Sequence, residues 1–66
     1  MSLTIIATRL DVLAESTSRV AQLENRGHAI NDLIGAGWVD IAAKLRDREY
    51  DADSLRGWAR MMRGEV

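Results

Sequence analysis

Three arginines near the end of the chain have the side-chain type and the spacing to bind phosphate or the edge of a DNA base. Arg56, Arg60 and Arg63 are four and three residues apart, so on a helix they share one narrow stripe. The planar guanidinium group donates two parallel hydrogen bonds to phosphate or guanine. The stripe suggests a nucleic-acid-binding helix. The simpler interpretation is a solvated basic face whose positive charges interact favourably with the helix dipole near the C-terminus. The apolar residues of the same segment centre on a separate face, so this helix can pack on a core while presenting its arginines: Leu55, Trp58, Ala59 and Met62.

The net charge of −1 does not by itself point to nucleic acid, but the charge is unevenly distributed. No acidic residue falls within 55–63, and fields between exposed charges are screened beyond about 8–10 Å at physiological salt, so local charge matters more than the total. Asp51 and Asp53 precede the stripe, and carboxylates there would repel phosphate. The simpler interpretation is that Asp53 caps the last helix and Asp51 is solvated.

The residue types give no support to catalytic or metal-binding chemistry. The chain has no cysteine and one histidine, which excludes a disulfide, a thiolate metal site and a histidine-rich site. That histidine, His28, belongs to no recognisable arrangement of nucleophile, base and orienting carboxylate. We therefore expect a protein that is not an enzyme and that needs no metal or other cofactor.

The segments that must position the arginines have the composition of helices, because proline is absent and Ala, Leu, Arg and Glu are abundant. Residues 16–18 could cap a new helix, but no Glu or Gln follows at the capping-box spacing, so continuity of the first helix is favoured. The sequence predicts an all-α, single domain (1–66) of three to four helices. The expected segments are one long N-terminal helix over 3–25, or two helices in series there, then a break at Asn25–Gly27 and a short helix from Ala29 to Ile34. A helix from Trp38 to about Glu49 and a last helix from Asp53 to about Arg63, which Gly64 ends, complete the chain.

The N-terminal segment carries apolar residues at alternating spacings of three and four, a heptad-like seam. A domain of this size rarely obtains more than about 3–5 kcal/mol from its own core, so self-association is an obvious supplement and tight helix packing is the alternative. We expect this seam to form a homodimer interface: Leu3, Ile6, Leu10, Leu13 and Val20.

The stretches "AINDLIGAGWVDIAAKL" and "SLRGWARMMR" together resemble helix-turn-helix DNA-binding proteins, especially the short repressors and accessory proteins of plasmids, phages and other mobile elements. The resemblance covers residues 29–63. Leu55 follows Leu45 by ten positions, which is long for this motif, and the turn lacks the expected glycine. The matching positions are Ile30 and Leu33, Gly35 and Gly37, Ile41-Ala42 with Leu45, and Ser54-Leu55-Arg56 with Trp58.

This resemblance implies a sequence-specific transcriptional regulator whose paired subunits place two recognition helices in successive major grooves of double-stranded DNA. A non-enzymatic protein-interaction module, such as a phage- or plasmid-encoded inhibitor or adaptor, is the alternative that fits the negative net charge. The chain shows no secretory signal and no apolar stretch that could span a membrane, so we expect a cytoplasmic protein. The expected DNA-contacting residues are Ser54, Arg56, Arg60, Arg63, Lys44, Arg46 and Arg48.

Overall fold

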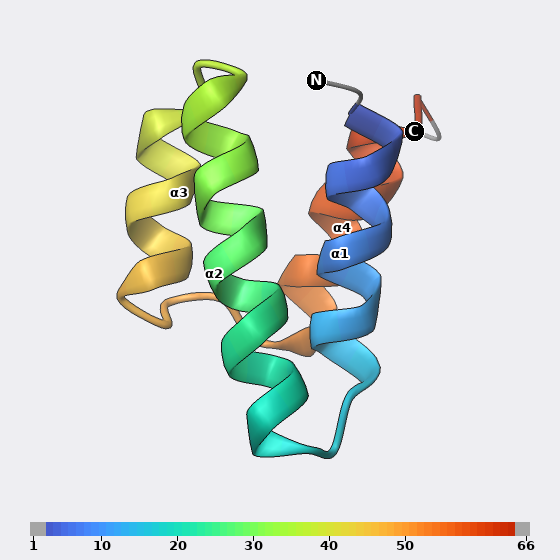
Figure 1. Ribbon diagram of the computed structural model, residues 1–66. Helices are drawn as coiled ribbons and strands as arrows, with labels where there is room; N and C mark the ends of the chain where they lie inside the picture. Colours follow the sequence, from blue (N-terminus) through green and yellow to red (C-terminus); the bar gives the residue numbers. More distant parts are fainter. Residues whose placement is uncertain (1–2, 65–66) are drawn as a thin grey trace.

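The computed structural model describes residues 3–64, and four helices with no strand make up this part of the chain. The outermost residues of the predicted 1–66 domain lie outside the described range. Successive helices run in opposite directions, and α1 packs against both α2 and α4, whereas α3 packs against α2 (Figure 1). The predicted all-α class is confirmed. The helices are α1 (Leu3–Glu15), α2 (Arg19–Gly35), α3 (Val39–Arg46) and α4 (Ala52–Met62).

The N-terminal segment forms two helices in series, the second of the two alternatives that the sequence left open, instead of the favoured continuous helix. Ser18 caps α2 from an extended conformation, and its hydroxyl accepts a hydrogen bond of 3.3 Å from the backbone N–H of Ala21. The side-chain amide of Gln22 donates a 2.6 Å hydrogen bond to the carbonyl oxygen of Ser16 and closes the corner. A serine cap alone satisfies a free N–H at the new helix start, without the glutamate of a full capping box.

The predicted break at Asn25–Gly27 was also wrong, because α2 continues through it to Gly35. The side-chain amide of Asn25 donates to the carbonyl oxygen of Ala21 at 2.8 Å, one turn earlier, and so stays on the helix surface. The helix ends instead at Gly35, and Gly37, which follows the C-cap residue Ala36, has a φ of 88°. Packing of Ala29 and Leu33 into the core outweighs the weak preference of Gly27 to end a helix.

The last two helices begin and end close to the predicted places. Helix α3 ends at Arg46, earlier than predicted, and Arg48 follows with a φ of 59°. Asp51, not Asp53, caps α4: its Oδ1 accepts a 2.8 Å hydrogen bond from the backbone N–H of Ser54. This hydrogen bond lowers the pKa of Asp51. Helix α4 ends at Met62, and Gly64 adopts a φ of 80°, as predicted for the terminating glycine.

The apolar seam of α1, which was expected to form a dimer interface, belongs to the core of its own chain. Ile6, Leu10 and Leu13 are 0–4% exposed and pack within their own chain, and Leu3 lies partly buried against the same core. These three side chains are covered by their own chain, which leaves them little surface to bury against a second copy. Spacing of three and four specifies an apolar face but not what covers it. Of the predicted seam, Val20 remains widely exposed, at 66%.

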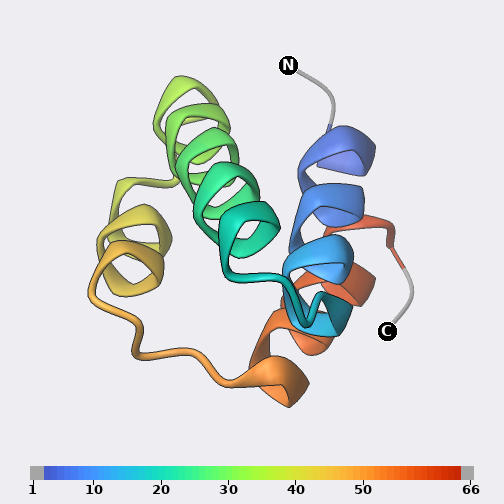
Figure 2. The same ribbon diagram turned by 60° about the horizontal axis from the view of Figure 1, so that its bottom comes forward.

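Helices α3 and α4 have no close backbone contact, and aromatic side chains connect α4 to the residues on either side of α3. No Cα atom of one helix lies within 8 Å of a Cα atom of the other. The chain crosses from the α2–α3 side to the α1–α4 side through residues 47–51 (Figure 2). Trp58 of α4 meets Trp38 edge to face at a centroid distance of 6.3 Å and meets Tyr50 at 6.2 Å. A close helix-turn-helix pair is therefore not confirmed for this segment.

Within residues 3–64, no helix is both long enough and apolar enough to cross a bilayer.

Candidate nucleic-acid interface

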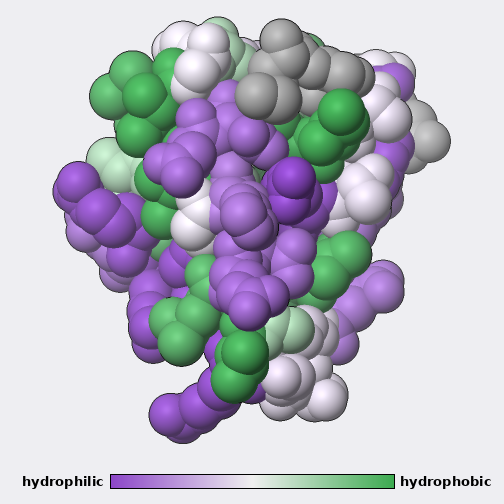
Figure 3. Space-filling view, in the orientation of Figure 1, coloured by the Kyte–Doolittle hydropathy of each residue, from purple (hydrophilic) through white to green (hydrophobic). Residues whose placement is uncertain are grey.

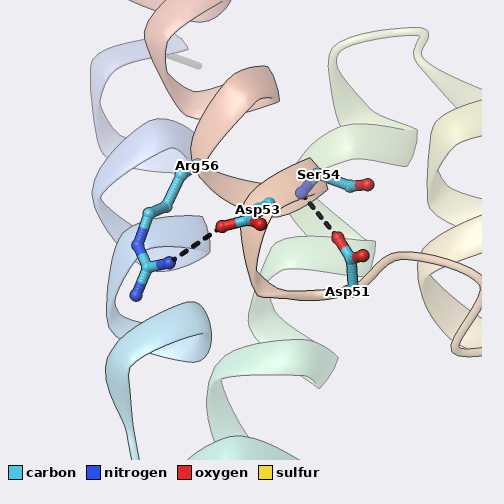
Figure 4. Close-up of polar contacts among 4 residues, drawn as sticks. All are labelled: Asp51, Asp53, Ser54 and Arg56. Carbon is cyan, nitrogen blue, oxygen red and sulfur yellow. Dashed lines mark hydrogen bonds and ion pairs between the residues drawn. The ribbon is translucent and has the colours of Figure 1, made fainter.

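The first arginine of the predicted stripe lies beside a carboxylate of its own helix. Arg56 Nη1 is 3.4 Å from Oδ1 of Asp53, one turn away, at the start of α4 (Figure 4). The Asp53 side chain is 96% exposed and that of Arg56 is 43% exposed. Ion pairs in such positions contribute about 0–1 kcal/mol, because water and salt screen them. Arg56 can therefore exchange this partner for another anion at little cost.

The last arginine of the stripe is held more firmly. Arg63 Nη2 lies 2.6 Å from Oδ2 of Asp11 on α1, and both side chains are only about one third exposed. This contact joins the end of α4 to the middle of α1. Arg63 was predicted to contact DNA phosphates, but the structure gives it a partner inside the protein.

Arg60 is the member of the stripe that stays open to solvent. Among residues 3–64 its guanidinium has neither an ion pair nor a hydrogen bond. Ser54, at the start of the same helix, is half-buried, and its backbone N–H is used by the Asp51 cap. The outward face of α4 thus offers Arg60 and, through a weak exchange, Arg56.

The basic residues predicted on α3 and after it are all exposed. Arg46 Nε is 3.2 Å from Oδ1 of the adjacent Asp47, and both side chains are more than half exposed. Lys44 and Arg48 have no ion pair in the described part of the chain. Because α3 and α4 are not adjacent, these residues and the α4 stripe do not form one continuous basic ridge.

A second arginine cluster joins α2 to the α3–α4 connection, and two of its members were missed from the sequence. Arg19 and Arg26 on α2, together with Arg48, line a partly enclosed hollow of about 220 Å³ that also contacts Gln22 and Leu23. Arg19 and Arg26 are seven residues apart and therefore share a side of one helix. Because the sequence predicted a helix break at Asn25–Gly27, Arg19 and Arg26 were not expected to lie on the same side of one helix.

The cluster is electrostatically uncompensated. Burial lowers the pKa of Arg26, and the positive charge of Arg48 lowers it further. The buried Nε of Arg26 has no hydrogen-bond partner among the described residues. None of the three arginines forms an ion pair within residues 3–64. The arrangement can bind an anion, and it offers no nucleophile or proton-transfer group for covalent chemistry.

His28 is exposed on α2, and across residues 3–64 no three His, Asp or Glu side chains gather as a metal ion would require. Comparisons with protein-family models, with curated proteins and with solved structures gave no match.

Proposed function

We propose that the protein is a non-catalytic DNA-binding regulator that acts as a homodimer. The observation that carries the proposal is the accessibility of the predicted basic residues. Of the six, only Arg63 is held in a close, partly buried ion pair. Lys44, Arg48 and Arg60 have no ion pair among residues 3–64, and Arg46 and Arg56 have exposed pairs that phosphate can replace cheaply.

The geometry favours contacts with the DNA backbone over extensive reading of bases. Helix α4 lies against α1, and the last arginine of the stripe, Arg63, is already paired with Asp11. Arg60 and Arg56 are then the residues on α4 that can reach a base edge, while the basic residues of α3 and Arg48 contact phosphates. Phosphate contacts fix the position of a protein on DNA, and base contacts supply its specificity.

Dimerisation in this proposal uses the outer side of α2 instead of the α1 seam. Val20, Leu23 and Ile34 fall within about 60° of one another on a helical wheel, and they are 66%, 59% and 51% exposed. The face of the molecule drawn in Figure 3 is mixed, with separate hydrophobic areas among hydrophilic ones. A second copy that packs its own α2 against this stripe would bury these aliphatic side chains.

Titration of the chain's own upstream DNA, followed by fluorescence anisotropy at several salt concentrations, tests the proposal. Arg60→Ala is expected to weaken binding and to reduce the slope of log affinity against log salt by about one. Asp53→Asn is expected to strengthen binding, because it removes the carboxylate that competes for Arg56. Arg9→Gln is the charge-matched control, since Arg9 is paired with Asp32 at 2.9 Å and is not in the predicted set. The proposal is contradicted if the chain does not bind this DNA at moderate salt. It is also contradicted if substitution of Arg60 and Arg56 leaves the affinity for DNA unchanged.

The exposed stripe on α2 also favours a second candidate, a helical protein-interaction module. In that case the stripe formed by Val20, Leu23 and Ile34 contacts a different protein, and the purified chain is monomeric in sedimentation equilibrium. Co-expression with the proteins encoded beside it would yield a stoichiometric complex that Leu23→Asp disrupts. A Leu23-dependent homodimer that binds DNA would instead rule this candidate out.

A further inference from the structure

Three helices in this fold are followed by a residue in the left-handed conformation, and in one of them an arginine takes the place usually held by glycine. After α2 and α4 the left-handed position is occupied by Gly37 and Gly64, whereas after α3 it is occupied by Arg48. The N–H of Arg48 donates to the Leu45 carbonyl at 3.2 Å and that of Glu49 to the Lys44 carbonyl at 3.0 Å, the hydrogen-bond pattern of a Schellman motif. A non-glycine residue in this conformation costs about 1–3 kcal/mol.

The strained residue belongs to the uncompensated cluster. Arg48 lines the same hollow as Arg19 and Arg26, and its charge acts unfavourably on Arg26. Two unfavourable features, a left-handed arginine and a buried guanidinium nitrogen without a partner, therefore meet at one place. Such costs persist where a compensating interaction exists in the functional state.

We propose that the hollow between α2 and the α3–α4 connection binds one phosphate group, held by Arg19, Arg26 and Arg48. Guanidinium groups match the oxygens of phosphate through paired hydrogen bonds, and a doubly charged oxyanion neutralises several of them at once. The free Nε of Arg26 would donate one of these bonds. A single water needs about 10–15 Å³ by the same measure of volume, so the hollow of about 220 Å³ accommodates a phosphate group with some of its hydration.

This inference does not depend on the proposed DNA binding, because a phosphate group can come from inorganic phosphate or from a DNA backbone. Both sources present the same oxygens to the three arginines. The experiment below uses each source as a separate arm.

In the first arm, the full chain is titrated with inorganic phosphate at constant ionic strength, with chloride as the balancing anion, and the arginine Nε–Hε signals are followed by NMR. A saturable shift of the Arg26 signal is expected. Arg26→Gln and Arg48→Gly are each expected to weaken binding about tenfold or more, since hydrogen bonds to charged groups contribute about 1.5–3 kcal/mol. Arg48→Gly is the sharper variant, because it removes the side chain while placing glycine where the backbone favours it. Arg9→Gln, which removes a charge outside both the hollow and the predicted DNA-contacting set, is the matched control and should bind as the parent chain does.

The proposal is overturned if the Arg26 signal shows no saturable response, or if Arg48→Gly and Arg26→Gln respond as the parent chain does. In the second arm, a short DNA duplex competes with phosphate. Competition together with weaker DNA binding by Arg26→Gln identifies a backbone phosphate as the occupant. Phosphate binding without competition supports the site with a free phosphate as its occupant. Failure of DNA binding alone contradicts the proposed function and leaves the phosphate site supported by the first arm.

Discussion

Arg63 Nη2 and Asp11 Oδ2 lie 2.6 Å apart, and this ion pair ties the last turn of α4 to the middle of α1. Since both side chains are about two thirds covered, the contact is screened less than a surface pair. We expect Asp11→Asn to lower the free energy of unfolding by about 1 kcal/mol. Urea denaturation measures this change. Asp53→Asn, which removes the exposed partner of Arg56, is the control and should cost clearly less. Equal costs for the two variants would show that the Arg63–Asp11 contact adds no stability.

The Asp51 cap predicts an acid-dependent loss of stability. Its pKa in the folded protein is below the ordinary value of 3.8, chiefly because its carboxylate accepts hydrogen bonds from Ser54. The ionised form therefore stabilises the fold fully above pH 3.8, and this contribution is lost as the pH falls through the lowered value. Thermal unfolding between pH 2 and pH 6 measures it. Asp51→Asn should keep the cap near neutral pH and lose this part of the pH dependence, whereas Asp51→Ala should be destabilised at neutral pH. A parent and an Asn variant with the same acid profile would exclude this role.

Burial of the α1 seam predicts that its residues stabilise the monomer. Ile6→Val should cost about 0.5–1.5 kcal/mol through a small cavity in the core. Val39→Ala, at a widely exposed position outside the proposed dimer stripe, should change stability by less than about 0.5 kcal/mol. Both values come from chemical denaturation, repeated at two protein concentrations. If the cost of Ile6→Val depended on protein concentration, the residue would lie between subunits after all.

Arg48 predicts a substitution that improves stability while removing a charged side chain. Arg48→Gly should raise the free energy of unfolding by up to about 1 kcal/mol, because relief of the left-handed conformation exceeds the entropy that glycine adds to the unfolded chain. A thermal melt at low phosphate concentration checks the direction. Arg48→Ala, which removes the charge but keeps the Cβ, is the matched control. A destabilised glycine variant would indicate that the side chain of Arg48 already makes a stabilising contact in the free protein.

The sequence was sufficient to predict the all-helical class and the end of α4, because the absence of proline, the apolar periodicity and Gly64 act locally. It was insufficient wherever a tertiary contact decides. Gly27 looks like a helix end, yet Ala29 and Leu33 bury themselves only if α2 continues. Leu10 in a heptad-like seam gives the same pattern whether α4 or a second copy covers it.

The candidate site likewise has features that local spacing predicted and features that tertiary contacts decide. The narrow stripe on α4 followed from spacing alone, but the capture of Arg63 by Asp11 joins residues 52 positions apart and leaves no mark on local periodicity. The hollow at Arg26 needs both an uninterrupted α2 and a connection that returns Arg48 to it. The first of these conditions was mispredicted, and the second is a property of the chain path.

The packing of α1 against α4 brings together the first and last helices of the chain. Core closure must therefore wait until the C-terminal segment has been synthesised, since until then the buried side of α1 has only α2 to cover it. For the same reason, a fragment restricted to residues 29–63 would retain α4 without the surface on which it rests. Removal of α1 should consequently unfold α4, and removal of α4 should unfold α1.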